Sequence, residues 1–552
     1  MTTCAKRSVA VMLAAGLCVN SFGQKSTVPN GWHLKDKAES GYYGISLDKA
    51  YNLVKGKKSK TVIVAVIDSG IDTLHEDLKP VLWTNAKEIP GNGIDDDNNG
   101  YVDDIHGWNF LGGRDGRNVK QDSYEAARVY HRFKSKFAEA DTTAFSDEDK
   151  SLYTTWKRAE KDVVGGIDPM ELFALKRMYP GFKSGDSVIA KELNKTEYNG
   201  NDLKTYTPTN QSAIMAKNII LGISKANNSY EITNTQLLEE LEGQLRKAEA
   251  VDSMPPNYRG DIVQDNYEDF NDRFYGNNDV MASTPFHGTH VAGIIGAARK
   301  NGKGIDGIAD NVKIMMIRAV PDGDEHDKDI ALGIRYAVDN GAKIINMSFG
   351  KGFSPEKHWV DSAVAYAASK GVLLVHAAGN SAANVDSTDN YPNPVFAADK
   401  KRATNWITVG ASGDPKLGTL VAGFSNYGKK EVDVFAPGMQ IYSTIPGGDT
   451  YGNAQGTSMA SPVVAGLAAF VLSYYPTLTA EQLKSVIERS AGKLPAKVKN
   501  PETGETVSLS DISVTGGLVN AYEAIKVAAS VTGDKKLQPL KTKPIVKKTR
   551  RA

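Results

Sequence analysis

The feature that most restricts the fold of this chain is an uninterrupted apolar run, TVIVAVI, from Thr61 to Ile67. Most of its residues are β-branched and none alternates with a polar residue, so a strand here must be buried on both faces. Strand-like runs recur at 312–319, 343–347 and 371–377, and a helical pattern covers 329–340. Strands that alternate with helices predict an α/β fold, a mainly parallel sheet with helices on both faces.

The stretch from 116 to 275 has a different character, with mixed charge, amphipathic segments and few strand signals. In its clearest helical segment, 233–250, one face carries Leu237, Leu238, Leu241 and Leu245. We predict a large helical insertion here. It would divide the α/β domain into a first part, 24–115, and a second part, 276–530.

The N-terminus has the pattern of a secretory signal peptide. Lys6 and Arg7 precede an apolar run from 8 to 19, and small residues lead up to Gly23. A membrane anchor is the alternative, but a span needs about 20 apolar residues. We therefore predict a signal peptide at 1–23 and a secreted or periplasmic protein. A lipoprotein is the less favoured interpretation, because Leu17 and not a small residue precedes Cys18.

Both cysteines, Cys4 and Cys18, lie in the segment that would be removed, so the mature chain would have neither a disulfide nor a thiol nucleophile. The 66 basic and 65 acidic residues nearly balance, which argues against nucleic acid or an anionic membrane as partner. The sequence has no second apolar run of about 20 residues, so stable membrane insertion is not predicted. Residues 531–552 form a basic tail, predicted to be disordered, with eight Lys and Arg after 534.

Attack on a peptide carbonyl at neutral pH requires an activated hydroxyl, a base, a carboxylate that orients the base, and donors for the oxyanion. Asp68 follows the buried strand and could orient an imidazole, although alone it could be an ordinary turn residue. His287 opens the helical segment HGTHVAGIIGA. With His290 it could instead bind zinc, but helical zinc motifs normally space their histidines four apart and include a glutamate.

Two further polar residues precede or follow apolar elements. Ser458, in GTSMASP, comes just before an apolar helical stretch, so its hydroxyl and N–H would lie among the free donors of a helix N-terminus. Asn380 ends the run VLLVHAAGN, where its amide could reach over a cleft. Alone, the serine would be a helix cap and the asparagine a turn residue.

Together, VAVIDSGID, HGTHVAGII, AAGN and GTSMASP occur in an order that closely resembles the signatures of the subtilisin family of serine peptidases. The resemblance implies that Asp68 orients His287, that His287 acts as general base and then acid, and that Ser458 forms an acyl-enzyme. It also implies that Asn380 and the Ser458 N–H bind the oxyanion. No cofactor for catalysis is implied.

The resemblance further implies polypeptide substrates. Ser348, Phe349 and Gly350 resemble the family's substrate-binding edge, which pairs with an extended peptide, and Gly379 precedes the oxyanion asparagine. Tyr391-Pro392 resembles the family's cis-proline turn. The alternative function is a catalytically silent peptide-binding protein. In either case the insertion is a candidate lid or platform for a protein partner.

Three departures from the family pattern are evident. Asp68 and His287 are 219 positions apart, which places the helical insertion between them. Fewer than about forty residues remain between the signal peptide and Thr61, too few for the family's usual propeptide.

The third departure is the acidic segment GNGIDDDNNGYVDDIHGW, which has the spacing of a calcium loop with a glycine at the sharp turn. The predicted structural calcium ligands are Asp95, Asp97, Asn99 and Asp103. His106 occupies the expected position of the terminal glutamate, and whether Asp103 or Asp104 supplies the last ligand stays open. A solvated acidic turn is the alternative.

Overall fold

The computed structural model describes residues 28–165, 168–195, 197–226, 230, 233–282, 285–493 and 497–531. The predicted signal peptide, 1–23, lies outside these ranges, as does all of the predicted basic tail except its first residue. The signal peptide and the disorder of the tail therefore stay predictions from the sequence.

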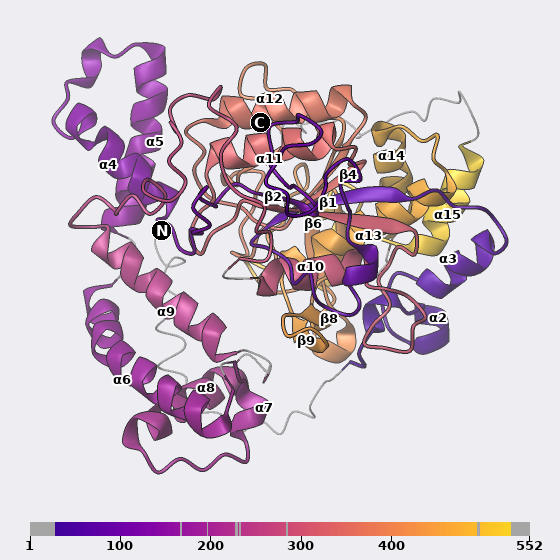
Figure 1. Ribbon diagram of the computed structural model, residues 1–552, viewed down its shortest axis with the longest axis horizontal. Coiled ribbons are helices and arrows are strands. Elements are labelled where there is room, and N and C mark those ends of the chain that lie inside the picture. Colours follow the sequence, from indigo (N-terminus) through magenta and orange to yellow (C-terminus); the bar gives the residue numbers. More distant parts are fainter. Residues whose placement is uncertain are drawn as a thin grey trace, which may run out of the picture.

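A nine-stranded, mostly parallel sheet forms the centre of the protein (Figure 1), with the order β10-β13-β7-β6-β5-β4-β1-β3-β2. Its strands are β1 Val62–Asp68, β2 Gly107–Asn109, β3 Val312–Arg318, β4 Ile344–Met347, β5 Leu373–Ala377, β6 Trp406–Ser412, β7 Val434–Pro437, β10 Gly492–Lys493 and β13 Gly517–Leu518. Only the short pair β10 and β13 runs antiparallel. Two separate antiparallel pairs are β8 Ile441–Ile445 with β9 Thr450–Ala454, and β11 Lys497–Lys499 with β12 Thr506–Ser508.

Both faces of the sheet are covered by helices, as the apolar run in β1 requires. Val64 and Val66 face one core, while Ala65 and Ile67 face the other. The first core is built with α3 Leu47–Val54, α10 Phe286–Gly296, α13 Thr457–Tyr474, α14 Ala480–Ser490 and α15 Ala521–Ser530, and the second with α11 Asp327–Asp339 and α12 Lys357–Ser369. The predicted fold class is therefore confirmed.

Helix α13 is long and apolar enough to cross a membrane by length and composition, but 89% of its residues are buried inside the protein. It packs against β4, β5, β6 and β7. The apolar character of α13 thus reflects its position as the central helix of the core, and its first turn carries Ser458.

The stretch predicted as an insertion contains α4 Glu125–Phe137, α5 Asp147–Val164, α6 Pro169–Leu193, α7 Gly200–Leu203, α8 Gln211–Ala226 and α9 Asn234–Glu249. These helices lie to one side of the sheet (Figure 1). Helices α6 to α9 have an apolar core of their own, in which Leu237 and Leu241 are buried and Leu238 and Leu245 are packed against it, as the sequence pattern predicts. Helices α4 and α5 share a second small core with Phe353 of the α/β part.

The chain leaves the sheet and returns to it at one place. Asn109, the last residue of β2, pairs with Asn277 through two backbone hydrogen bonds of 2.9 and 3.1 Å. Residues 251–282, all within the described part, form neither a helix nor a strand, yet Val263 and Tyr275 belong to the second core. This returning segment is therefore part of the α/β body.

Candidate active site

The residues singled out by the motifs come together at one edge of the sheet. Strand β1 ends at Asp68, β4 ends just before Ser348, and β5 ends three residues before Asn380. Because β1, β4 and β5 are adjacent and parallel, their carboxyl ends lie at the same edge, which is where α/β folds bind ligands.

Asp68 and His287 form a hydrogen-bonded pair. His287 Nδ1 lies 2.7 Å from Asp68 Oδ1, which also accepts the Ser69 N–H at 2.8 Å. Asp68 is 2% exposed and the His287 side chain 38%. An ionised carboxylate can only accept, so Nδ1 carries the proton and Nε2 is left as the basic nitrogen.

This pairing depends on two glycines and a buried arginine. A Cβ on Gly288 would lie 2.1 Å from Gly70 O, so only glycine lets the first turn of α10 approach the loop after β1. Gly70 itself has φ +130°, a conformation that side chains rarely adopt. Arg318, at the end of β3, donates to Ser69 O at 3.0 Å, and its burial lowers its pKa to about 10. A lone arginine at a strand end gave no sequence signal for this role.

The pKa of His287 is raised above 6.5 although burial acts to lower it, because the charge of Asp68 and the hydrogen bond to it outweigh burial. A raised imidazole pKa means that the neutral, basic form accumulates only as the pH rises through that value. Asp68 therefore both orients the imidazole of His287 and raises its pKa.

Ser458 lies in the first turn of α13 and is tied to the end of β4. Its hydroxyl donates to Ser348 O at 3.0 Å and not to His287, while Ser348 Oγ donates to Ser458 O at 2.9 Å. Asn346 Nδ2 in turn donates to Ser348 Oγ at 2.9 Å. These bonds fix the serine relative to the predicted substrate edge.

Asn380 is oriented by Thr457, which the sequence analysis did not single out although it adjoins Ser458. The Asn380 Oδ1 accepts hydrogen bonds from Thr457 N and from Thr457 Oγ1, both at 2.9 Å. A Cβ on Gly456 would lie 3.4 Å from Asn380 Nδ2 and 3.6 Å from Ser458 N. Asn380 Nδ2 and the Ser458 N–H therefore border the same small space. Because Thr457 engages the Asn380 oxygen, the amide presents its NH₂ group there, and both groups are hydrogen-bond donors.

A cavity of about 360 Å³ adjoins these groups. Its lining includes every predicted substrate-binding residue, together with two of the four predicted catalytic ones: Ser348, Phe349, Gly350, Gly379, Asn380 and Ser458. The Tyr391-Pro392 bond nearby is cis, as the resemblance implies. The size of the cavity and the polar groups that converge on it suit a binding cleft.

The zinc alternative for His287 and His290 gains no support: one nitrogen of each ring is already engaged, and among the described residues the group of three or more possible metal ligands lies in the acidic loop instead. His290 is fully buried, and its Nε2 lies 3.0 Å from Ile441 O and 3.2 Å from Gly452 O. Two carbonyl partners require this nitrogen to carry a proton, so it cannot bind a metal. The Nδ1 of His287 is occupied by Asp68.

The acidic loop brings Asp95 and Asp97 together with Glu88, a residue that the motif spacing did not include. Ligand oxygens of these three side chains lie within 4.8 Å of one another. Calcium ligands stand 2.3–2.6 Å from the ion, so oxygens at such separations can share one cation.

The other two predicted calcium ligands have different partners. The Asp103 carboxylate accepts the backbone N–H groups of Gly91, Asn92 and Gly93. The Asn99 side chain accepts from Tyr101 N and donates to Asp104. Asp104 is further bonded to Asn85 and Tyr336, and its burial raises its pKa to about 6. Asp103 and Asp104 thus make hydrogen bonds that hold the loop, and Glu88 and Asp95 also accept backbone N–H groups of the loop.

A parallel sheet covered on both faces, with an acid–imidazole pair and a serine at a helix N-terminus along one edge, defines a hydrolase of the serine type. Comparison with known proteins narrows this class. The sequence profile described as "Subtilase family" matches residues 59–509.

Curated relatives agree with this match. Subtilisin DY from Bacillus licheniformis is 41% identical over 212 residues, 38% of this chain and 71% of that protein. Thermitase from Thermoactinomyces vulgaris is 36% identical over 271 residues, covering 48% and 85%. Subtilisin E from Bacillus subtilis is 40% identical over 209 residues, covering 37% and 50%. The chain belongs to the subtilase family and is a serine-type endopeptidase.

Proposed function

We propose that this protein hydrolyses polypeptides through an acyl-enzyme, with Asp68, His287 and Ser458 as its triad. The observation that carries the proposal is the 2.7 Å contact between His287 and Asp68 at the sheet edge where Ser458 borders the cleft. For attack, the Ser458 hydroxyl turns from Ser348 O towards His287 Nε2, gives up its proton and bonds to the peptide carbonyl carbon. His287 then returns the proton to the leaving amine.

The carbonyl oxygen becomes an oxyanion in this step, and Asn380 Nδ2 and the Ser458 N–H are its proposed donors. The helix N-terminus adds positive potential at the same point. Water then attacks the acyl-enzyme with His287 again as base, which releases the acid product and restores the serine.

The test of the chemistry is covalent labelling. A fluorophosphonate probe should modify Ser458, identified by mass spectrometry of the labelled peptide, and the same preparation should cleave casein. A folded protein that neither labels nor cleaves would favour the catalytically silent alternative.

The proposed oxyanion donor can be tested with Asn380→Asp. This change keeps an oxygen that can accept from Thr457 and replaces the donating Nδ2 with a second oxygen. We expect kcat to fall by at least about 10² to 10³, the size measured for loss of such an asparagine in subtilisin, a relative of this chain, because the introduced carboxylate also repels the oxyanion. KM and the melting temperature should change little. A variant with unaltered kcat would remove Asn380 from the mechanism.

The proposal includes a structural calcium ion held by Glu88, Asp95 and Asp97, since carboxylate oxygens are the donors that this ion prefers. Chelation should lower the melting temperature. Adding calcium at 100 times its Kd should raise the free energy of unfolding by about 2.7 kcal/mol. Glu88→Gln should abolish this response. The control, Asp96→Asn, alters a carboxylate of the same loop outside the cluster and should keep it. A melting temperature indifferent to both chelator and calcium would contradict the ion.

The proposed site of action is outside the cytoplasm, after removal of residues 1–23. The support for this is the charged and apolar pattern of the N-terminus. Sequencing the N-terminus of the protein recovered from the culture medium and from the periplasm tests both the cleavage and the location.

A further inference from the structure

A second, larger cavity of about 880 Å³ lies between the insertion and the substrate edge. Helices α4, α5, α6 and α9 contribute to its wall, and residues 350–353 close it on the side of the α/β part. Its volume falls within the range of ordinary ligand sites.

This cavity adjoins the active-site cleft. Gly350, Lys351, Gly352 and Ser381 line both. Gly352 is exposed at this junction, and its carbonyl oxygen accepts a hydrogen bond of 2.7 Å from Arg158 of α5. The edge begins beside Ser458 at Ser348, and following it to Gly352 leads away from the nucleophile and into the larger cavity. A peptide paired along this edge therefore continues there.

The cavity has an apolar floor. Leu175, Ala250 and Phe353 line it and are buried, each in one of the two small helical cores. Apolar side chains of a bound peptide can therefore be taken out of water here.

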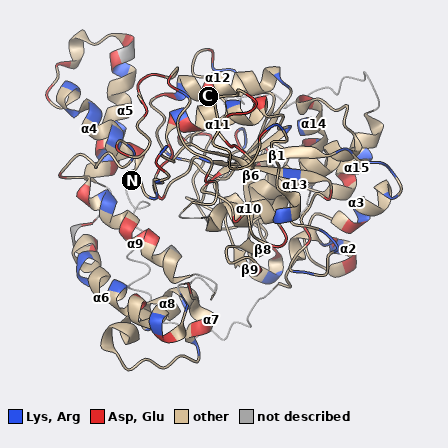
Figure 2. Cartoon of the chain, in the orientation of Figure 1, with Lys and Arg blue, Asp and Glu red and all other residues tan. Residues whose placement is uncertain are grey.

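The charges around the floor do not cancel. Basic and acidic residues are both spread over the insertion helices (Figure 2). On the cavity wall, some of these charged side chains have an ion-pair or hydrogen-bond partner and others do not. Among the described residues, no hydrogen bond or ion pair is made by the carboxylates of Asp162, Glu171 and Glu249.

Two of the wall's four cations are already neutralised. Arg246 pairs with Asp322 at 2.9 Å, and Lys351 is held by Glu125 at 2.8 Å. The other cations on the wall are Lys161 and Lys247, and Lys247 lies 4.1 Å from the centre of the Tyr124 ring. Free carboxylates thus outnumber free cations, and the cavity favours a basic ligand.

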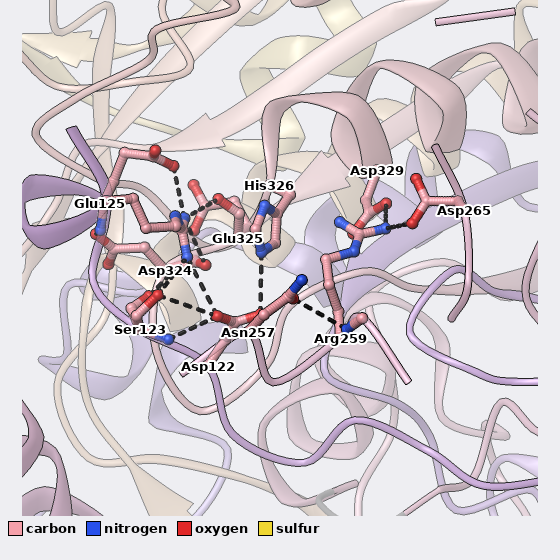
Figure 3. A network of polar contacts seen from close by, with 12 residues as sticks. Asp122, Ser123, Glu125, Asn257, Arg259, Asp265, Asp324, Glu325, His326 and Asp329 are labelled. Carbon is pink, nitrogen blue, oxygen red and sulfur yellow. Dashed lines mark hydrogen bonds and ion pairs between the residues drawn. The ribbon is translucent and has the colours of Figure 1, made fainter. Parts of the chain in front are cut away.

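Buried charges join helix α4 of the wall to the substrate edge. Lys351 follows Gly350 in the sequence. Its Nζ lies 2.8 Å from Glu125 Oε2 of α4 and 2.9 Å from Asp327 Oδ1 of α11. Figure 3 shows Glu125 beside a second pair, His326 and Asp122, joined at 2.9 Å. Side chains in both pairs are at least nine-tenths buried. Helix α4, one of the four helices of the wall, is therefore preorganised relative to the cleft, which lowers the cost of binding.

We propose that the insertion extends the substrate cleft, and that its cavity binds a stretch of the polypeptide substrate carrying both basic and apolar side chains, remote from the scissile bond. This inference rests on the proposed endopeptidase activity, and it assigns the insertion to selection among substrates.

The test compares a short fluorogenic peptide with peptides that carry the same cleavable sequence and six further residues at one end or the other. The extension is built from lysine and leucine, or from glutamate and leucine. For the wild type, the lysine extension at one end should raise kcat/KM at least about tenfold, equivalent to about 1.4 kcal/mol, and the glutamate extension should not.

Ala126→Trp fills the cavity from α4 and should remove this gain while retaining cleavage of the short peptide. Ala365→Trp is the matched control, an exposed alanine on α12 that lines neither cavity, and it should keep the gain. The double variant Asp162→Lys, Glu171→Lys adds no bulk to the core and should transfer the preference to the glutamate extension.

No gain at either end, an equal gain for lysine and glutamate, or a gain that survives Ala126→Trp would each overturn the inference. So would a gain seen only after removal of residues 532–552, because that result would assign the cavity to the chain's own basic tail. Failure of the wild type to cleave even the short peptide would instead defeat the proposed endopeptidase activity.

Discussion

Ser458→Ala is expected to lower kcat by about 10⁶, the size found when the serine of subtilisin, a relative of this chain, is removed. The reason is that Ser458 carries the hydroxyl proposed as nucleophile, whereas the neighbouring Thr457 hydroxyl is engaged in its hydrogen bond to Asn380 Oδ1. Folding should be retained, since the Ser458 hydroxyl makes a single hydrogen bond, to Ser348 O. Hydrolysis of a chromogenic peptide and labelling by a fluorophosphonate measure the effect, and the melting temperature measures the fold.

Ser473→Ala is the matched control for this experiment. Ser473 lies near the other end of α13, where its hydroxyl bonds only within the helix, to Phe470 O. This variant should label and cleave like the wild type. Residual activity of Ser458→Ala above a hundredth of the wild type, in a preparation free of contaminating peptidase, would show that another nucleophile operates.

Asp68→Asn is expected to lower kcat/KM by about 10⁴, because an amide can present its NH₂ group to His287 and stabilise the wrong tautomer. The pKa of His287 should also fall, since its upward shift comes from Asp68 while burial, which lowers it, remains. In the wild type, activity should be lost as the pH falls through a value above 6.5. In the variant this acid limb should move to lower pH.

Two measurements check this prediction separately. The pH profile of kcat/KM reports the pKa of the free enzyme's base, and NMR titration of the His287 ring reports it without turnover. An acid limb that stays in place in Asp68→Asn, with the ring titrating as before, would show that Asp68 does not support the imidazole. Asp339→Asn, a remote surface change at the end of α11, should leave both readouts unaltered.

The parallel strands could be predicted because each is a continuous apolar run. The run at 61–67 became β1, and those at 312–319, 343–347 and 371–377 became β3, β4 and β5 with ends shifted by at most two residues. Strands of two or three residues, such as β2 and β13, have too few side chains to show a period. Their existence depends on partners far away in the sequence.

The candidate site was predictable only where a motif contains the residue. Asp68, His287, Asn380 and Ser458 each stand in such a motif, and the structure brings them to one edge. Glu88 joins Asp95 and Asp97 from outside the spacing pattern. Its position follows from the path of the loop, which spacing does not encode.

The same limit applies to the charged residues that join the insertion to the cleft. Lys351 and Glu125 are 226 positions apart yet share a buried hydrogen bond. In the sequence, each is one charged residue among many, and composition would place both at the surface. Contacts of this kind depend on the tertiary fold alone.

The paired backbones of Asn109 and Asn277 have a consequence for how this enzyme can diversify. The segments of chain that leave and re-enter the sheet are hydrogen-bonded to each other. The helical insertion between them can therefore lengthen, shrink or be exchanged with little disturbance of the sheet. Recognition of distant parts of a substrate can then evolve while the bond-breaking machinery stays as it is. A transplant of the insertion into a compact relative at the equivalent junction would be the engineering counterpart of that process.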